Sequence, residues 1–220
     1  MSMKNRHVLG EAVRHLILII LALYTLAPLL FLFVNAFKSN NEIIASPVAL
    51  PEHWTLQYIK TAMEAINFGK ALGLTFIITF FSILLLVIVS SFAAWAMVRS
   101  KTILSNIVFL CFTAAMLVPF QSLMYPLLSV FEKMGLKNVQ GLILMYGGFG
   151  LSMSVFLYHG FIKSVPASLE EAAVLDGANL FQMFFKVVFP LLKGTTVTVI
   201  VLNGMWIWND YLLPFLVIET

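Results

Sequence analysis

Five long apolar runs constrain the fold of this chain more than any other feature. Each run is long enough to cross the hydrocarbon core of a bilayer, for which a helix of about 20 residues suffices. Because lipid offers no hydrogen-bond partner, a spanning segment must be a helix or part of a closed barrel, and these runs lack the alternation of barrel strands. The sequence therefore predicts an all-α, polytopic transmembrane helical bundle with spans at about 16–36, 71–98, 103–125, 142–162 and 195–218.

The composition supports a membrane protein. Charged residues make up 10% of the chain and hydrophobic residues 61%, whereas a soluble domain carries about 25% charged residues. The polar segments between the runs are too short to fold alone, so residues 1–220 are expected to form a single transmembrane domain. The lone cysteine, Cys111, lies inside an apolar run and cannot form an internal disulfide.

Positive charges indicate the orientation. With the N-terminus inside the cell, the cytoplasmic segments hold eight of the 13 Lys and Arg residues, and the outer segments hold the other five. The positive-inside rule thus predicts a cytoplasmic N-terminus. Lys4, Arg6 and Arg14 precede the first run as in a signal peptide, but that run is too long for a signal core, so we expect it to be retained as a span.

Prolines and glycines mark the expected breaks between helices. The first outer segment, 38–70, is expected to hold one short surface helix, and the second, 126–140, a short amphipathic helix that ends near Gly135. Pro119 and Pro214 lie inside the third and fifth runs, where each is expected to kink its helix.

The segment between the last two runs, 163–193, carries the most specific pattern. Ser168 lies three residues before Glu171, which is the spacing of a capping box, and the pattern predicts a first helix over 169–176. Gly177 is expected to end this helix, because glycine adopts the left-handed conformation found at helix ends.

A second short helix is expected after this glycine corner. Asn179 and Gln182 form another capping pattern, and Pro190 is expected to stop the helix before the fifth span. The first helix carries two glutamates beside Ala172 and Ala173, a small-residue surface that suits docking into a groove on another protein. A surface helix that merely connects two spans fits this pattern equally well.

The spacing of this loop resembles that of a known family. Glu171-Ala172-Ala173, then Gly177, and finally Phe189-Pro190 are similar to the EAA loop of type I ABC importer permeases. The resemblance implies that the loop is a coupling helix, which inserts into a cleft of an ATPase subunit. It thereby assigns ATPase coupling to Glu170, Glu171, Ala172, Ala173, Asp176, Gly177 and Pro190.

The resemblance extends over nearly the whole chain. The segment from Trp206 to Pro214 looks like the carbohydrate branch of the family, in particular the second permease subunits of maltose-type and raffinose-type importers. It implies a bacterial plasma (inner) membrane subunit that works with a second permease, two ATPases that bind ATP and Mg, and an extracellular or periplasmic sugar-binding protein. The family usually has a sixth span, and the sequence ends at Thr220, so that span is expected to be missing here.

Polar and aromatic residues inside the runs are candidates for the transport path. Aromatic faces stack on a sugar, amides and carboxylates bind its hydroxyls, and polar groups in lipid are costly unless they face protein or water. An interfacial aromatic belt is the alternative for the tryptophans, and a bond between helices is the alternative for Gln121. Gly147, Gly148 and Gly150 are expected to permit close helix packing. The path candidates are Gln121, Asn203, Trp206, Trp208, Asn209, Asp210 and Tyr211.

Catalytic signatures are missing from the sequence. It has no phosphate-binding loop, no nucleophile motif and no paired catalytic carboxylates, so the chain is expected to be a non-enzymatic subunit without a cofactor of its own. The four histidines are too scattered for a metal site. Three alternatives stay open: a permease for another solute, a membrane scaffold, and an ATPase-independent secondary transporter or channel. The scarcity of intramembrane charges counts against the last.

Overall fold

The chain consists entirely of helices and loops over its described part. The structure, a computed structural model, describes residues 3–218 and divides into two compact units, Met1–Ala71 (unit 1) and Leu72–Thr220 (unit 2). The described residues contain helices and no β-strand, which confirms the all-α fold. The side chains of Lys4 and Arg6, which contribute to the positive charge before the first run, lie outside the described part.

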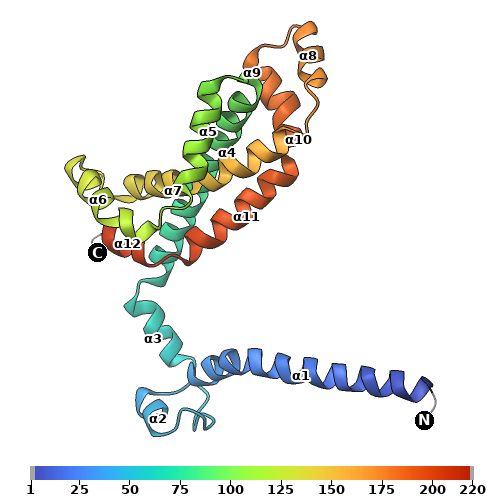
Figure 1. Ribbon diagram of the computed structural model, residues 1–220. Coiled ribbons are helices and arrows are strands. Elements are labelled where there is room, and N and C mark those ends of the chain that lie inside the picture. Colours follow the sequence, from blue (N-terminus) through green and yellow to red (C-terminus); the bar gives the residue numbers. More distant parts are fainter. Residues whose placement is uncertain (1–2, 219–220) are drawn as a thin grey trace. The chain divides into compact units, whose positions relative to one another are not determined.

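Unit 1 contains one long helix and a loop with two short helices (Figure 1). The helices are α1 (Met3–Asn35), α2 (Asn40–Ala45) and α3 (Gln57–Ala65). Only one short helix was expected in this loop. The additional helix, α2, begins at a complete capping box between Ser39 and Glu42. The backbone N–H of Ser39 donates to the Glu42 carboxylate at 2.7 Å, and this bond holds the pKa of Glu42 below its usual range.

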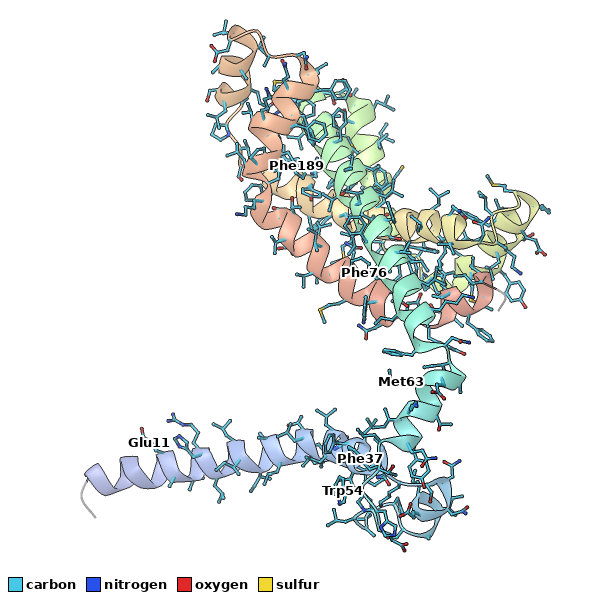
Figure 2. All side chains as sticks on the ribbon, turned by 180° about the vertical axis from the view of Figure 1, so that it is seen from behind. Glu11, Phe37, Trp54, Met63, Phe76 and Phe189 are labelled. Carbon is cyan, nitrogen blue, oxygen red and sulfur yellow. The ribbon has the colours of Figure 1, made fainter. Side chains whose placement is uncertain are left out.

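The loop of unit 1 folds back onto the end of α1. Lys38 is buried, and its Nζ donates to the carbonyl of Ser46 at 3.1 Å. The rings of Phe37 and Trp54 pack with their centroids 5.0 Å apart (Figure 2). From Gly10 to Phe33 the residues of α1 are exposed, and the apolar side chains project on all sides of the helix. A helix that is apolar all round is typical of a membrane span.

Unit 2 is a helical bundle in which α4, α7 and α11 are the longest helices (Figure 1). Its elements are α4 (Phe68–Ser100), α5 (Ile103–Ala115), α6 (Phe120–Lys133), α7 (Val139–Ile162), α8 (Ser168–Leu175), α9 (Leu180–Met183), the π-helix η1 (Phe184–Val188), α10 (Phe189–Leu191), α11 (Lys193–Asn209) and α12 (Leu212–Val217). The helix expected near 126–140 is α6, which begins earlier and is followed by Gly135 at φ 69°.

Three of the described helices are long and apolar enough to cross a membrane alone. They are the segment Gly10–Asn35 of α1, α4 and α7. Two bent pairs pass the same test together: α5 with α6, bent by 106°, and Leu180–Leu191 with α11, bent by 76°. The described residues therefore provide up to five spans, if each bent pair counts as one.

Proline explains one of these breaks and fails to explain another. Pro119 caps the start of α6 with ψ 137°, and the residue before a proline avoids the helical conformation, so the third run breaks there as expected. The kink expected at Pro214 was wrong. The fifth run breaks instead at Asp210, whose ψ is 127°. Pro214 lies in the first turn of α12, where a backbone N–H needs no helical partner.

Glycines bring α7 close to its neighbours. A Cβ added at Gly147 would lie 2.6 Å from Leu85, and one at Gly150 would lie 2.6 Å from both Leu86 and Asn203. The expected close packing is confirmed at these two positions. Nothing lies within 4 Å of a Cβ at Gly148, so that glycine serves no such contact.

Two apolar cores hold unit 2 together along these helices. One lies toward the end of the bundle that carries α8, and the other toward the end that carries α12. The first is centred on Ala94, Trp95, Val155, Tyr158, Ile162, Phe184, Val188, Leu192 and Val199. The second is centred on Ile78, Leu86, Leu142, Met145, Tyr146, Ile207, Leu213 and Val217.

Candidate functional site

The loop between α7 and α11 begins with the short helix α8. The capping box expected between Ser168 and Glu171 was wrong, because Ser168 is already the first helical residue and makes no capping bond. The first turn starts earlier, at Pro166 and Ala167: the N–H groups of Glu170 and Glu171 donate to the carbonyl of Ala167 at 2.9 and 3.0 Å. Proline suits this position because its fixed φ matches the start of a helix.

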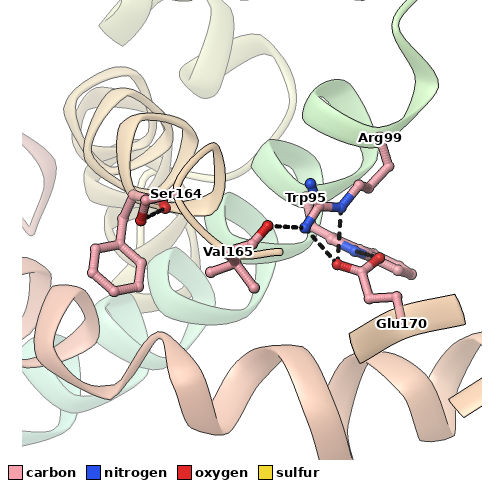
Figure 3. Close-up of polar contacts among 6 residues, drawn as sticks. Trp95, Arg99, Ser164, Val165 and Glu170 are labelled. Atoms are coloured by element: carbon pink, nitrogen blue, oxygen red, sulfur yellow. Dashed lines mark hydrogen bonds and ion pairs between the residues drawn. The ribbon is translucent and has the colours of Figure 1, made fainter. Parts of the chain in front are cut away.

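Glu170 anchors α8 to the end of α4. Its carboxylate accepts hydrogen bonds from Trp95 Nε1 at 3.0 Å and from Arg99 Nε at 2.8 Å, and it forms an ion pair with Arg99 Nη2 at 2.7 Å (Figure 3). The same Nη2 atom also donates to the carbonyl of Val165 at 3.0 Å. We call these four residues, Trp95, Arg99, Val165 and Glu170, the brace.

The brace is shielded from water. The Glu170 side chain is 9% exposed and that of Arg99 is 23% exposed. A buried charge is costly unless it is paired and hydrogen-bonded, and here both requirements are met. No pattern in the sequence pointed to this role: Arg99 counted only as a positive charge, and Trp95 as one apolar residue of the second run. The brace fixes the position of α8 on the span that precedes it.

The corner after α8 follows the expected chemistry. Gly177 has φ 81°, a left-handed conformation that an L side chain adopts only with strain. Asn179 and Gln182 form a complete capping box at the start of α9, with bonds of 2.9 and 3.0 Å. The predicted sequence of helix, glycine corner and helix is therefore confirmed at these residues.

The exposed surface of α8 includes two of the remaining coupling candidates, Glu171 and Ala172. Glu171, Ala172 and Leu175 are exposed, and at 100° per residue they lie roughly 100° to 200° around the helix from Glu170. A hollow of 420 Å³ adjoins them at the glycine corner. It is lined by Ala173, Asp176, Gly177, Ala178, Gln182, Lys186 and Val187. Of the expected coupling residues, Glu170 belongs to the brace, whereas Ala173, Asp176 and Gly177 meet at this hollow.

Pro190 was expected to end the second helix, and this prediction was wrong. The chain continues through it, and the bend lies at Leu192, between α10 and α11. The turn before the proline is the π-helix η1, in which the N–H of Phe189 donates to the carbonyl of Phe184. The wider turn accommodates the proline ring, which would clash with a regular helix. Phe184 is buried and packs against Trp95 of the brace at a centroid distance of 5.3 Å.

Asp210 of the candidate transport path is bound within the chain. Tyr146, buried on α7, donates its hydroxyl to the Asp210 carboxylate at 2.9 Å. The backbone N–H of Leu212 donates to the other carboxylate oxygen at 3.1 Å. Asp210 therefore fixes the corner between α11 and α12 against α7.

Asn203 and Trp206 lie at a hollow of 530 Å³ in unit 2. Asn203 is buried and donates to Ser154 Oγ at 3.1 Å. Trp206 packs edge-on against Tyr146 and Phe149 at centroid distances of 5.5 and 6.5 Å. The lining is mostly apolar and comes from α6, α7 and α11 and from the α5–α6 corner. An apolar hollow with a few polar groups is the common form of a small-molecule site.

The structure does not bring the other path candidates to this hollow. Trp208, Asn209 and Tyr211 are exposed, and Tyr211 stacks on Phe215 at 5.5 Å. Gln121 is also exposed and is not among the residues that line the hollow. Among the described residues, no group of three or more His, Cys, Asp or Glu side chains could hold a metal ion.

The chain matches the family described as binding-protein-dependent transport system inner membrane component over residues 87–219. The matched region begins within α4 and contains the brace, α8, the glycine corner and α11.

Several curated proteins are similar to the chain over most of its length. It is 46% identical over 201 residues to the probable starch degradation products transport system permease protein AmyC of Thermoanaerobacterium thermosulfurigenes, covering 91% of this chain and 73% of that protein. It is 32% identical over 220 residues to the multiple sugar-binding transport system permease protein MsmG of Streptococcus mutans, covering 99% and 79%. It is 34% identical over 186 residues to the melibiose/raffinose/stachyose import permease protein MelC of Bacillus subtilis, covering 84% and 67%.

A solved structure shares the fold. The chain superposes with a TM-score of 0.83 on one chain of the crystal structure of a bacterial ABC transporter involved in the import of the acidic polysaccharide alginate. The match covers 100% of this chain and 77% of that chain, at 23% sequence identity.

Proposed function

Because this chain belongs to the family of binding-protein-dependent transport system inner membrane components, we infer that it is the membrane-spanning permease subunit of an ATP-driven sugar importer. It is a multi-pass integral membrane protein. In this proposal it forms half of the translocation pathway, and a second permease forms the other half. The observation that carries the proposal is the fixed position of α8, which the brace holds on α4 while Glu171, Ala172 and Leu175 remain exposed.

We propose that α8 docks into a groove of an ATPase subunit. A short helix that presents small residues beside a carboxylate suits such a groove, and the adjoining hollow of 420 Å³ offers room for a side chain of the partner. Because the brace ties α8 to α4, a movement of α8 would be passed to that span. The ATPase subunits, and not this chain, would bind ATP and Mg and hydrolyse the nucleotide.

This role sets the orientation of the chain. An ATPase that uses cellular ATP lies in the cytoplasm, so the α8 loop must face it. Four crossings precede that loop if α1, α4, the α5–α6 pair and α7 each cross once. In this proposal the N-terminus therefore also lies in the cytoplasm. The excess of Lys and Arg in the same segments supports this orientation.

Sugar is the solute that the relatives and the hollow support together. The relatives named above are named for the transport of starch degradation products, for a multiple sugar-binding transport system, and for the import of melibiose, raffinose and stachyose. Trp206 offers an aromatic face and Asn203 an amide at the hollow of unit 2, which are the groups that a sugar requires. A sugar-binding protein outside the cell would deliver the solute.

Uptake into vesicles tests this proposal. The tagged full chain is co-purified with its partners, reconstituted, and supplied with maltodextrins, raffinose, a peptide and an amino acid, with and without ATP. The expected result is that a sugar is taken up and that its uptake requires ATP. ATP-driven uptake of the peptide or amino acid alone would instead indicate a permease for another solute. Uptake that needs no ATPase would identify a self-contained transporter or channel.

A further inference from the structure

A polar hollow of 550 Å³ lies beside the brace and has no role in the function proposed above. It is built where α4 ends, at Ser100, where α5 begins, at Ile103, and where α7 ends, at Ile162. Its polar lining consists of four basic side chains, one amide and one hydroxyl. These are Arg99, Lys101, His159, Lys163, Asn106 and Ser164. No Asp or Glu is among its lining residues, all of which belong to the described part of unit 2.

His159 shows that this hollow is more than a group of surface lysines. His159 is only 6% exposed, and its ring stacks on the ring of Phe109 at a centroid distance of 3.6 Å. It forms no hydrogen bond with another described residue, yet it lines the hollow. Neither ring nitrogen is among the fully buried, unpaired atoms of the described residues, so the ring keeps a nitrogen open to the hollow, where an acceptor can bond to it.

The basic groups leave donors for an anion. Arg99 uses Nε and Nη2 in the brace, which leaves Nη1 without a bond to the described residues. Lys163 lies over the Phe109 ring at 5.9 Å, and neither Lys163 nor Lys101 forms an ion pair with a described residue. The hollow therefore carries a surplus of positive charge at a point where three helices meet.

The position of the hollow identifies the anion. The apolar helices α4 and α7 both end beside it, so it lies at the depth where the hydrocarbon of a bilayer gives way to head groups. Basic pockets between membrane helices at this depth bind the phosphate groups of anionic lipids. We propose that this hollow binds the phosphate of an anionic lipid, with Lys101, Lys163 and His159 as its donors.

Lipid binding to the purified full chain tests the proposal. Native mass spectrometry would titrate the chain with phosphatidylglycerol and, separately, with phosphatidylcholine of the same acyl chains. The test variant is Lys101→Gln/Lys163→Gln, and the matched control is Lys186→Gln/Lys193→Gln, which removes two lysines of the same loop region outside the hollow. His159→Phe keeps the stacking on Phe109 and removes only the nitrogen donors. Arg99 is left unchanged because it also holds the brace.

The expected result is preferential binding of phosphatidylglycerol that depends on the hollow. Each lysine near an anionic head group contributes a factor of roughly five, so the test variant should bind this lipid about 25-fold more weakly. The control pair should change binding less than about twofold, since its lysines do not reach the hollow. His159→Phe should also weaken phosphatidylglycerol binding.

Three results would overturn the proposal. They are equal binding of the two lipids, equal losses in the test and control variants, or displacement of phosphatidylglycerol by millimolar inorganic phosphate. The last result would identify a site for soluble phosphate. Circular dichroism is recorded for each variant as a control for folding. A loss of lipid binding in a folded variant is then assigned to the missing side chains.

Discussion

Glu170 and Glu171 are neighbours of the same charge, yet the structure gives them different surroundings. Glu170 is buried against Arg99 and Trp95, whereas Glu171 is exposed on α8. From the sequence alone, both glutamates were assigned to the coupling motif. Only the fold separates them, because the turn that starts at Pro166 rotates α8 so that Glu170 points at the end of α4.

Removing the arginine of the brace should loosen α8. In Arg99→Gln the buried Glu170 carboxylate loses its charged partner, which costs about 3 kcal/mol, at the low end for breaking a buried ion pair. Hydrogen exchange of the amides over 168–175 should therefore become about a hundredfold faster. Lys101→Gln, two residues away and outside the brace, is the control and should leave this exchange unchanged. Unchanged exchange in Arg99→Gln would show that the brace does not hold α8.

The glycine corner should be intolerant of a side chain for a conformational reason. At Gly177 no atom lies within 4 Å of an added Cβ, but φ is 81°, so Gly177→Ala should cost about 1 to 2 kcal/mol. Limited proteolysis should cut this variant faster between α8 and α9. Gly160→Ala, which also has open space but lies inside α7, is the matched control and should be neutral or slightly stabilising. Equal cutting of both variants would contradict this explanation.

Helices were easier to predict than the bends between them. Apolar runs of span length, the break at Pro119 and the glycine corner all follow from local chemistry, and the structure has them. The bend at Asp210 and the continuation through Pro190 do not follow from local chemistry. The bend at Asp210 involves a hydrogen bond from Tyr146, which is distant in sequence. The continuation through Pro190 depends on the π-turn before it, and no proline or glycine rule predicts either feature.

Contact between α7 and its neighbours depends on the absence of a side chain at Gly150. An added methyl group in Gly150→Ala would meet Leu86 and Asn203 at 2.6 Å, and such overpacking costs about 1 to 3 kcal/mol. The thermal unfolding midpoint of the purified chain should fall accordingly. Gly148→Ala, on the same helix but with open space around it, should leave the midpoint nearly unchanged. A fall of equal size in both variants would contradict this explanation, because Gly148→Ala meets no neighbouring atom and alanine favours a helix more than glycine does.

The corner between α11 and α12 should depend on one hydroxyl of α7. Tyr146→Phe removes the hydrogen bond to the Asp210 carboxylate, and a bond to a charged group contributes about 1.5 to 3 kcal/mol. Hydrogen exchange of α12 should become faster in this variant. Asp210→Asn keeps an acceptor for the tyrosine and should have a smaller effect. A larger effect of Asp210→Asn would show that the charge itself, and not this bond, fixes the corner.

At the scale of the whole molecule, the sequence supports the membrane class, the family and the all-α fold. These depend on the long apolar runs and on the spacing of the EAA loop, which a single sequence displays. The candidate transport path was harder to predict: only Asn203 and Trp206 line the hollow of unit 2, while Gln121 and Trp208 do not. Aromatic and amide residues occur both in binding sites and at membrane interfaces, so residue type alone cannot separate the two.

Site-directed cross-linking can capture the proposed contact between α8 and an ATPase. Cys111 is first replaced by Ser, and a single cysteine is then placed at Leu175, an α8 position that is 88% exposed. The control cysteine replaces Met134, which is 62% exposed at the end of α6. Leu175→Cys in native membranes should form a covalent adduct with an ATPase subunit, and Met134→Cys should not. No adduct from Leu175→Cys, or equal adducts from both positions, would contradict it.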